Sequence, residues 1–293
     1  MRKLLYFILI ATLCSCSFSK GVKKDLATGL FYNYNGFRLD KITAYNGYGE
    51  QLTSNVLPEF SNLVLIFNNV ENYEVVEGVV SFGCELTVTD EDGKVCLEYD
   101  DLFKNMKGIA PREAKNPRII VTFANPMVAG KTYLVKGKFY DKHKPENHIN
   151  VEMKVEVTPA KIEFEKQEKV LSFEKLLFGT PSGEFPENKV KLGTKATILV
   201  KGIKGYTLEN DRAFVGCSVV VTDKQGNRVL ESEDIFADNV EGSTSVQAEA
   251  VSIDITYGNP IKANQQYHVH ARIFDKKNPD AEIVLDMNVD VVE

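Results

Sequence analysis

The sequence predicts an all-β protein that consists of two antiparallel β-sandwich domains in tandem, preceded by a leader segment. Three observations support this prediction: apolar and polar residues alternate in several short runs, turns rich in Asp and Gly separate the runs, and one long pattern occurs twice. The chain has 293 residues, of which 43% are hydrophobic. That composition can build cores, so it excludes a disordered or collagen-like chain.

The internal repeat has a period of 133 to 134 residues. The segment Gly83–Asp90 matches Gly216–Asp223, and similar matches follow in the same order along both halves. The two copies cover residues 28–157 and 160–293. Because each copy has enough strand-like runs for a complete domain, we expect two separate domains rather than one large one.

Within each copy the pattern is that of short strands. Buried-type and polar residues alternate over Tyr267–Ile273, which places one face in a core and the other in water. Asp90–Gly93 and Asp223–Gly226 have the residues of hairpin turns. Helical turns are expected only after Asp101 and Asp234, where acidic residues suit a helix start. The repeat length and strand spacing favour immunoglobulin-like sandwiches, with a lipocalin-type fold as the alternative.

The N-terminus has the features of an export signal. Arg2 and Lys3 precede an uncharged apolar run, Leu4–Leu13. As a helix this run covers roughly 15 Å, too little for a hydrocarbon core about 30 Å thick, so it suits a signal peptide rather than a permanent span. The following Leu13-Cys14-Ser15-Cys16 resembles the lipobox of bacterial lipoproteins. The resemblance implies that residues 1–15 are removed and that Cys16 carries lipid; a plain secretory signal is the alternative.

Several consequences follow if Cys16 is lipidated. Removal of Arg2 and Lys3 changes the formal net charge from −6 to −8. Ser17 stands where Asp is usually associated with inner-membrane retention, so the resemblance implies the outer membrane of a cell that has two. Residues 16–27 are polar and basic, which predicts a flexible tether. The chain has 35 basic and 41 acidic residues, which argues against a nucleic-acid partner.

Three cysteines lie outside the leader region: Cys84, Cys96 and Cys217. Cys84 and Cys96 flank a predicted hairpin turn, but they are offset along the strands by about 10 Å at 3.3 Å per residue, too far for a disulfide. Cys84 and Cys217 are equivalent in the two repeats. We therefore predict free, buried thiols without metal or redox chemistry.

Two histidines, His268 and His270, lie two residues apart on a predicted strand, so their rings share one face. Such a pair can present two nitrogen ligands to zinc or copper. Their counterparts in the first repeat are Leu134 and Lys136, neither of which is a suitable ligand. The sequence therefore favours a solvated pair, and we predict no metal and no cofactor.

An aromatic cluster occupies eighteen residues of the first repeat and has no counterpart of equal density in the second. Its tyrosines are interleaved with Asn and Gly, a combination that can contact a glycan, because a flat ring covers a sugar face while amides bond its hydroxyls. Packing in the core or between the domains is the favoured explanation. The candidate ligand-contacting residues are Tyr32, Tyr34, Tyr45 and Tyr48.

The sequence has no motif of a nucleophilic or metal-dependent hydrolase, so we predict no catalytic residues and no enzyme activity. The leading functional prediction is a lipid-anchored, non-enzymatic protein of the cell envelope that acts as a binding or spacing module. Its partners would be the membrane, through the lipid, and another envelope protein or a glycan. Two alternatives remain: a glycan-binding surface lipoprotein, and a subunit similar to fimbrillin-type pilins, for which Lys20, Lys23 or Lys24 would supply the cleavage site.

Overall fold

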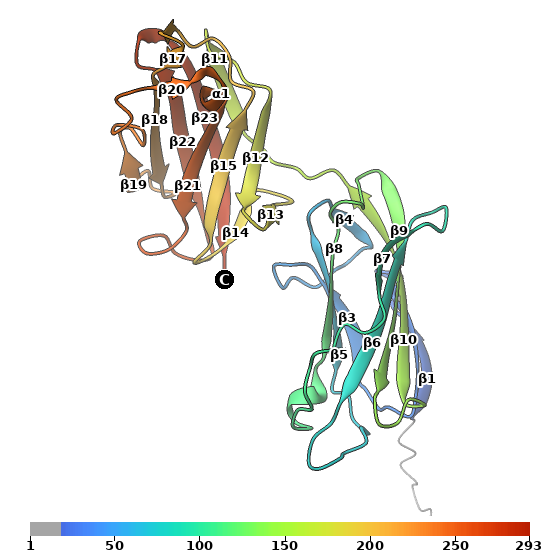
Figure 1. Ribbon diagram of the computed structural model, residues 1–293. Coiled ribbons are helices and arrows are strands. Elements are labelled where there is room, and N and C mark those ends of the chain that lie inside the picture. The colour runs from blue at the N-terminus through green and yellow to red at the C-terminus, as the bar shows by residue number, and fades with distance from the viewer. Residues whose placement is uncertain (1–18) are drawn as a thin grey trace, which may run out of the picture.

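The computed structural model describes residues 19–293, and Figure 1 shows them as two β-sandwiches joined by an extended segment. The predicted signal peptide, residues 1–15, and the lipidation site Cys16 lie outside the described residues. Between residues 19 and 293 no helix is long and apolar enough to cross a bilayer. The prediction of an all-β protein with two tandem antiparallel sandwiches is confirmed.

The first sandwich pairs a seven-stranded sheet, ordered β1-β2-β10-β9-β6-β7 with β4 beside β10, with a three-stranded sheet, β3-β5-β8. A single 3-10 turn, Glu113–Lys115, is its helical element among the described residues. The strands are β1 Lys20–Lys24, β2 Phe31–Asn35, β3 Lys41–Tyr45, β4 Val56–Pro58, β5 Asn62–Asn68, β6 Phe82–Thr89, β7 Val95–Tyr99, β8 Arg118–Thr122, β9 Lys131–Asp141 and β10 His148–Thr158.

The second sandwich pairs a six-stranded sheet, ordered β11-β23-β22-β18-β19 with β14 beside β23, with a four-stranded sheet, β13-β12-β15-β21. A small sheet, β16-β17-β20, and the helix α1, Ser245–Ala248, complete it. The strands are β11 Glu165–Lys169, β12 Lys175–Thr180, β13 Gly183–Glu184, β14 Lys189–Lys191, β15 Lys195–Lys201, β16 Leu208–Glu209, β17 Arg212–Ala213, β18 Val215–Thr222, β19 Arg228–Ser232, β20 Ser243–Thr244, β21 Ala250–Thr256, β22 Gln265–Asp275 and β23 Asn278–Val292.

The large sheets of the two sandwiches have the same strand order. The series β2-β10-β9-β6-β7 in the first corresponds to β11-β23-β22-β18-β19 in the second, and the parallel strands β4 and β14 add to equivalent places. Each sandwich has its own cluster of buried apolar residues between two separate sheets. This arrangement excludes the lipocalin-type alternative.

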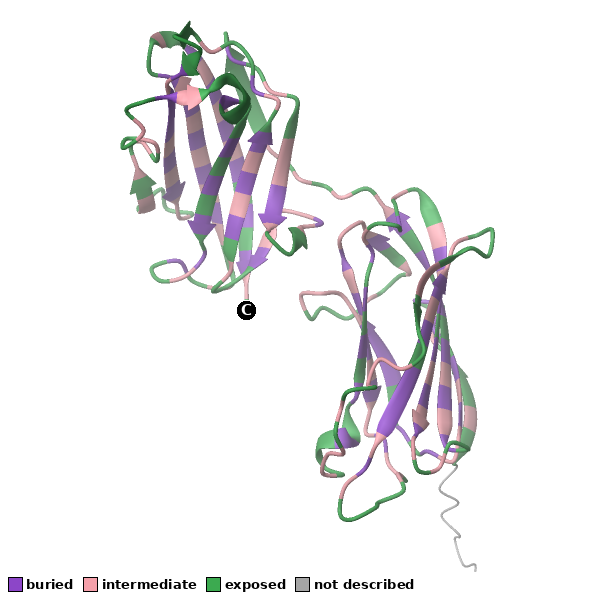
Figure 2. Ribbon diagram, in the orientation of Figure 1, coloured by how far each residue is buried: buried purple, intermediate pink, exposed green. Residues whose placement is uncertain are grey.

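Alternation along the strands creates these cores. In β22 the residues Tyr267, Val269, Ala271 and Ile273 are all buried, and the residues between them face outward. Figure 2 shows the same striping on the long strands of both sandwiches. Burial of apolar surface contributes roughly 25 cal/mol per Å² to the stability of the fold. The one-sided pattern therefore stabilises the packing of the two sheets against each other and determines which residues remain on the outer faces.

Both predicted hairpin turns are present. In each one, an Asp carboxylate, that of Asp90 or Asp223, accepts the backbone N–H groups of the second and fourth residues that follow, at 2.9 to 3.1 Å. Gly93 and Gly226 adopt φ angles of 80° and 82°, which favour glycine over residues that carry a Cβ. These aspartates therefore organise turns, as the sequence predicts.

The helical turns expected after Asp101 and Asp234 are corrected: each aspartate is followed by a non-helical turn. Asp101 Oδ1 accepts the N–H groups of Cys84 at 3.0 Å and of Phe103 at 2.8 Å. Its Oδ2 lies 2.8 Å from Lys142 Nζ. The carboxylate thus holds the turn against β6 and β9 rather than capping a helix.

The second repeat has the same arrangement around Asp234. This carboxylate accepts the N–H groups of Cys217 at 3.0 Å and Phe236 at 2.9 Å, and it lies 2.7 Å from Lys276 Nζ. Burial disfavours the ionised form, but the hydrogen bonds from Lys276 and the two N–H groups outweigh burial and lower the pKa of Asp234. The pKa of Asp101 is lowered for the same reasons.

The flexible tether expected over residues 16–27 is wrong for the part that the structure describes, residues 19–27; residues 16–18 lie outside it. Lys20–Lys24 form β1, which pairs antiparallel with β2 along its whole length. Lys23 Nζ also donates to the Asp40 carbonyl at 2.6 Å. The strand was not predicted because Lys-Gly-Val-Lys-Lys has no apolar alternation; ladder hydrogen bonds to β2, a long-range effect, hold it in place.

We predict that Asp101→Ala and Asp234→Ala each lower the free energy of unfolding by about 1–3 kcal/mol, because two N–H groups and a lysine lose their acceptor. The folded-state pKa values are lowered, so the stabilisation is complete above the unfolded pKa of about 3.9 and is lost as the pH falls through the folded value. Urea unfolding at neutral and acidic pH measures both effects. The exposed Asp238→Ala is the control; an equal loss in it would contradict the assignment.

Candidate functional site

Two of the four candidate ligand-contacting tyrosines lie inside the first sandwich. Tyr32 is 3% exposed and Tyr34 is 8% exposed, and both belong to the core cluster. The Tyr32 hydroxyl accepts the N–H of Ile42 at 3.3 Å. Burial, the largest effect, raises the pKa of Tyr32. The proposal of Tyr32 and Tyr34 as ligand contacts is therefore corrected: their rings pack in the core, the explanation that the sequence favoured.

Tyr45 and Tyr48 lie nearer the surface, at the end of β3 and in the loop that follows it. Tyr45 is partly buried on the strand, opposite Val64. Tyr48 instead reaches the second repeat, where its hydroxyl donates to the Lys189 carbonyl at 3.1 Å. Of the four tyrosines, Tyr48 is the one that the structure places between the repeats.

Lys189 forms the centre of this contact. Its ammonium lies 4.9 Å from the centre of the Tyr48 ring, 3.3 Å from Glu50 and 3.2 Å from Glu187. Burial disfavours the charged lysine, but hydrogen bonds and charges from Glu187 and Glu50 outweigh burial and raise its pKa. Burial, followed by the charges of Glu187 and Glu50, raises the pKa of Tyr48. Lys189 therefore remains charged and Tyr48 neutral at physiological pH.

A cleft of about 630 Å³ lies beside this contact and is lined by residues of both repeats. Its walls combine aromatic rings with amide, hydroxyl and charged groups. Such a lining can hold a polar ligand that has flat apolar faces. The lining includes Tyr48, Phe60, Phe185, Asn46, Asn62, Thr122, Thr180, Ser182, Glu50, Glu184, Glu187, Lys189 and Lys191. The sequence does not predict this cleft, because its two walls come from different repeats and are distant from each other in the chain.

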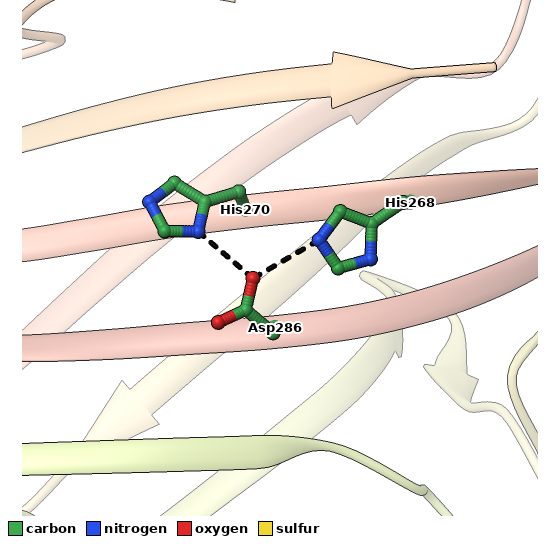
Figure 3. A group of neighbouring side chains, drawn as sticks. All are labelled: His268, His270 and Asp286. Carbon is green, nitrogen blue, oxygen red and sulfur yellow. Dashed lines mark hydrogen bonds and ion pairs between the residues drawn. The ribbon is translucent and has the colours of Figure 1, made fainter. Parts of the chain in front are cut away.

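The two predicted surface histidines lie on the outer face of the second sandwich. Figure 3 shows both of them beside Asp286. His268 and His270 come from β22, and Asp286 is directly opposite His270 on β23. Asp286 Oδ1 is 3.0 Å from His268 Nε2 and 2.8 Å from His270 Nδ1. Asp286 is not among the residues predicted from the sequence; the register of the β22–β23 hairpin is the signal that places it beside the histidines.

The cysteines are free thiols, as predicted: Cys84, Cys96 and Cys217 form no disulfide. Cys84 and Cys217 are 0% exposed, which confirms the predicted burial, whereas Cys96 is partly exposed, so that prediction is wrong for Cys96. Burial, supported by the nearby Asp101 in the first repeat and Asp234 in the second, raises the pKa of both buried thiols to about 12. A buried thiol with such a pKa forms almost no thiolate at neutral pH and is a poor nucleophile.

Comparisons with known proteins assign no family. No family model matches the chain, and no curated protein matches it. A DUF3823 family protein from Bacteroides ovatus is 10% identical, with a TM-score of 0.24; the match covers 76% of this chain and 94% of that one. The structure called pT26-6p is 9% identical, with a TM-score of 0.24 and coverages of 93% and 65%.

Bacteroides uniformis beta-glucuronidase 2, in covalent complex with cyclophellitol-6-carboxylate aziridine, is a third match. It is 10% identical with a TM-score of 0.23, and the match covers 79% of this chain but 26% of that enzyme. At these TM-scores the likenesses define neither a family nor a function.

We predict that, in the native chain, iodoacetamide alkylates Cys96 and leaves Cys84 and Cys217 unmodified, because the reagent attacks accessible thiolates. Unfolding in urea should make all three reactive. Peptide mass spectrometry after a short pulse of reagent measures the modification at each position. Equal labelling of Cys84 and Cys96 in the native chain would show that the first thiol is accessible.

Proposed function

We propose that this chain is a lipid-anchored, non-enzymatic protein of the cell envelope that acts as a binding and spacing module. The observation that carries the proposal is the cleft between the two repeats, with Tyr48 and Lys189 at its edge. Clefts between domains are common ligand sites, because a ligand there contacts two surfaces that can adjust to it.

The contact between the repeats is polar and local. Within residues 19–293 it includes one hydroxyl-to-carbonyl hydrogen bond, an ion pair between Lys189 and Glu50, and the Lys189 ammonium over the Tyr48 ring. Domains joined by a small polar contact move relative to one another unless something bridges them. A ligand in the cleft would supply such a bridge, so binding and the spacing of the two sandwiches are coupled.

The lining favours an oligosaccharide as the ligand class. The rings of Tyr48 and Phe185 offer faces for sugar C–H groups, and the amides of Asn46 and Asn62 offer donors and acceptors for hydroxyls. Acidic and basic groups are both present, so a neutral or weakly charged glycan suits the cleft better than a polyanion.

The anchor is supported by the leader sequence and by the position of β1. If lipid is attached at Cys16, Lys20, the start of β1, is four residue steps further along the chain, a span of at most about 14 Å at 3.5 Å per residue. The first sandwich would then lie close to the bilayer, and Lys20, Lys23 and Lys24 would add positive charge near the lipid headgroups. The second sandwich, which forms the other wall of the cleft, would then lie further from the membrane surface.

A specific observation also favours the pilin-like alternative. Strand β1 has no equivalent in the second repeat, where β11 is the edge strand of the large sheet among the described residues. Cleavage after Lys24 would remove β1 and open the edge of β2 to a strand from another copy. Native gels after limited trypsin treatment test this alternative: a ladder of polymers would support it, and a single monomer band favours the binding module.

We predict that full-length protein binds oligosaccharides on a glycan array and that Tyr48→Ala weakens binding of the best ligand about tenfold, because an aromatic contact is lost. The chain has no Trp, so quenching of tyrosine fluorescence measures affinity in solution. Tyr45→Ala is the matched control, since Tyr45 lies three residues away outside the cleft lining. A flat array response would remove the glycan proposal.

We predict that cells that express the native chain incorporate radioactive palmitate into it and that Cys16→Ala abolishes the label, because the lipidated thiol is absent. Cys96→Ala serves as a control that keeps the label. Fractionation of the native protein should place it with the outer membrane. An unlabelled native protein would contradict lipid anchoring and would favour a plain secretory signal.

A further inference from the structure

We propose that His268, His270 and Asp286 form a binding site for a divalent transition-metal ion, with zinc(II) as the reference metal. The site lies on the outer face of the second sandwich and does not depend on the cleft. Two imidazole nitrogens and one carboxylate oxygen are ligands of the kind that zinc and its neighbours prefer.

The three ligand atoms already have nearly the spacing that a metal requires. Their separations are all within 4.8 Å, and Asp286 Oδ1 lies 3.0 Å from one imidazole nitrogen and 2.8 Å from the other. Bond lengths of 2.0–2.2 Å in a tetrahedral zinc site place neighbouring ligand atoms about 3.3 Å apart. The two oxygen-to-nitrogen distances need to lengthen by a few tenths of an ångström, and the two nitrogens need to approach each other by at most about 1.5 Å, a change that side-chain rotations can supply.

Asn288 provides a hydrogen-bond partner for the ring of His268. Its other ring nitrogen, Nδ1, is 3.2 Å from Asn288 Oδ1, the residue opposite it on β23. Metal-bound histidines characteristically donate the second N–H to such an oxygen, which fixes the tautomer and aims the free nitrogen at the metal. Here that arrangement aims Nε2 at Asp286, where the metal would bind.

The first repeat shows that the fold does not require this cluster. The equivalent positions are Leu134, Lys136 and Glu152, and Lys136 and Glu152 form an ordinary ion pair at 3.9 Å. Cross-strand pairing on this face is therefore satisfied without histidine. The second repeat alone, within residues 19–293, has three ligand-type side chains at this place.

The site is open to a metal and keeps free coordination positions. The side chains of His268 and His270 are 42% and 45% exposed, and that of Asp286 is 27% exposed. Glu165, on the neighbouring strand β11, is opposite Asp286 and adds negative charge beside the site. Arg272, further along β22, is paired with Glu282 at 2.6 Å, so its charge is compensated. Water or a ligand from a partner would fill the remaining positions.

Isothermal titration of the purified full chain with ZnCl₂ tests the proposal. We expect one zinc ion per chain, and at least about tenfold weaker binding in each of His268→Ala, His270→Ala and Asp286→Asn. Asn288→Ala should weaken binding by a smaller factor. The matched controls are His148→Ala, a partly exposed histidine of the first repeat, and Asp290→Asn, four residues along β23 from Asp286; both should bind as the native chain does.

A second readout separates binding from misfolding. Zinc should raise the midpoint of thermal unfolding of the native chain and the two controls, but not that of Asp286→Asn, whose shape is nearly unchanged. The proposal is overturned if the native chain binds no zinc at micromolar concentrations. It is also overturned if the three ligand variants bind zinc as tightly as the native chain.

Discussion

The register of one long antiparallel hairpin in each sandwich determines most of the structure. Strands β9 and β10 pair over ten positions in the first repeat, and β22 and β23 pair over eleven in the second. A slip by one residue would turn every inward side chain toward water and every outward one into the core. The same register that buries Tyr267 and Val269 therefore places His268 and His270 outside, with Asp286 across from them.

The duplication provides an internal comparison, because two copies of one fold share their structural requirements. Both copies have three features in equivalent places. These are the aspartate that bonds a turn and a lysine (Asp101 or Asp234), the hairpin turn that contains Asp and Gly, and the buried cysteine. The features found in one copy only do not belong to the shared cores. Strand β1, the Tyr48 loop and the His268–Asp286 cluster all lie at an edge, between the repeats or on an outer face, where they add little to either core.

The sequence predicts those parts of the structure that depend on local pattern. The strand alternation, the two turns and the repeat can be read directly, because side-chain period and turn chemistry act over a few residues. Strand β1 could not be predicted, because its pairing with β2 and not its own residues holds it. Tyr32 and Tyr34 were ambiguous, since an alternating aromatic strand fits both a core and a ligand platform until the opposite sheet is known.

The cleft beside Tyr48 and the cluster of His268, His270 and Asp286 were not predicted, because each depends on residues that are distant in the sequence. Tyr48 and Lys189 meet across 141 positions of the chain, and Asp286 meets His268 across 18. The second distance is within a hairpin, so a register argument could have found Asp286 from the sequence. The first depends on how two domains sit against each other through a small polar contact, which no local pattern encodes. Because a bridging ligand can easily replace a weak contact of that kind, the proposed function assigns both spacing and recognition to the junction of the repeats.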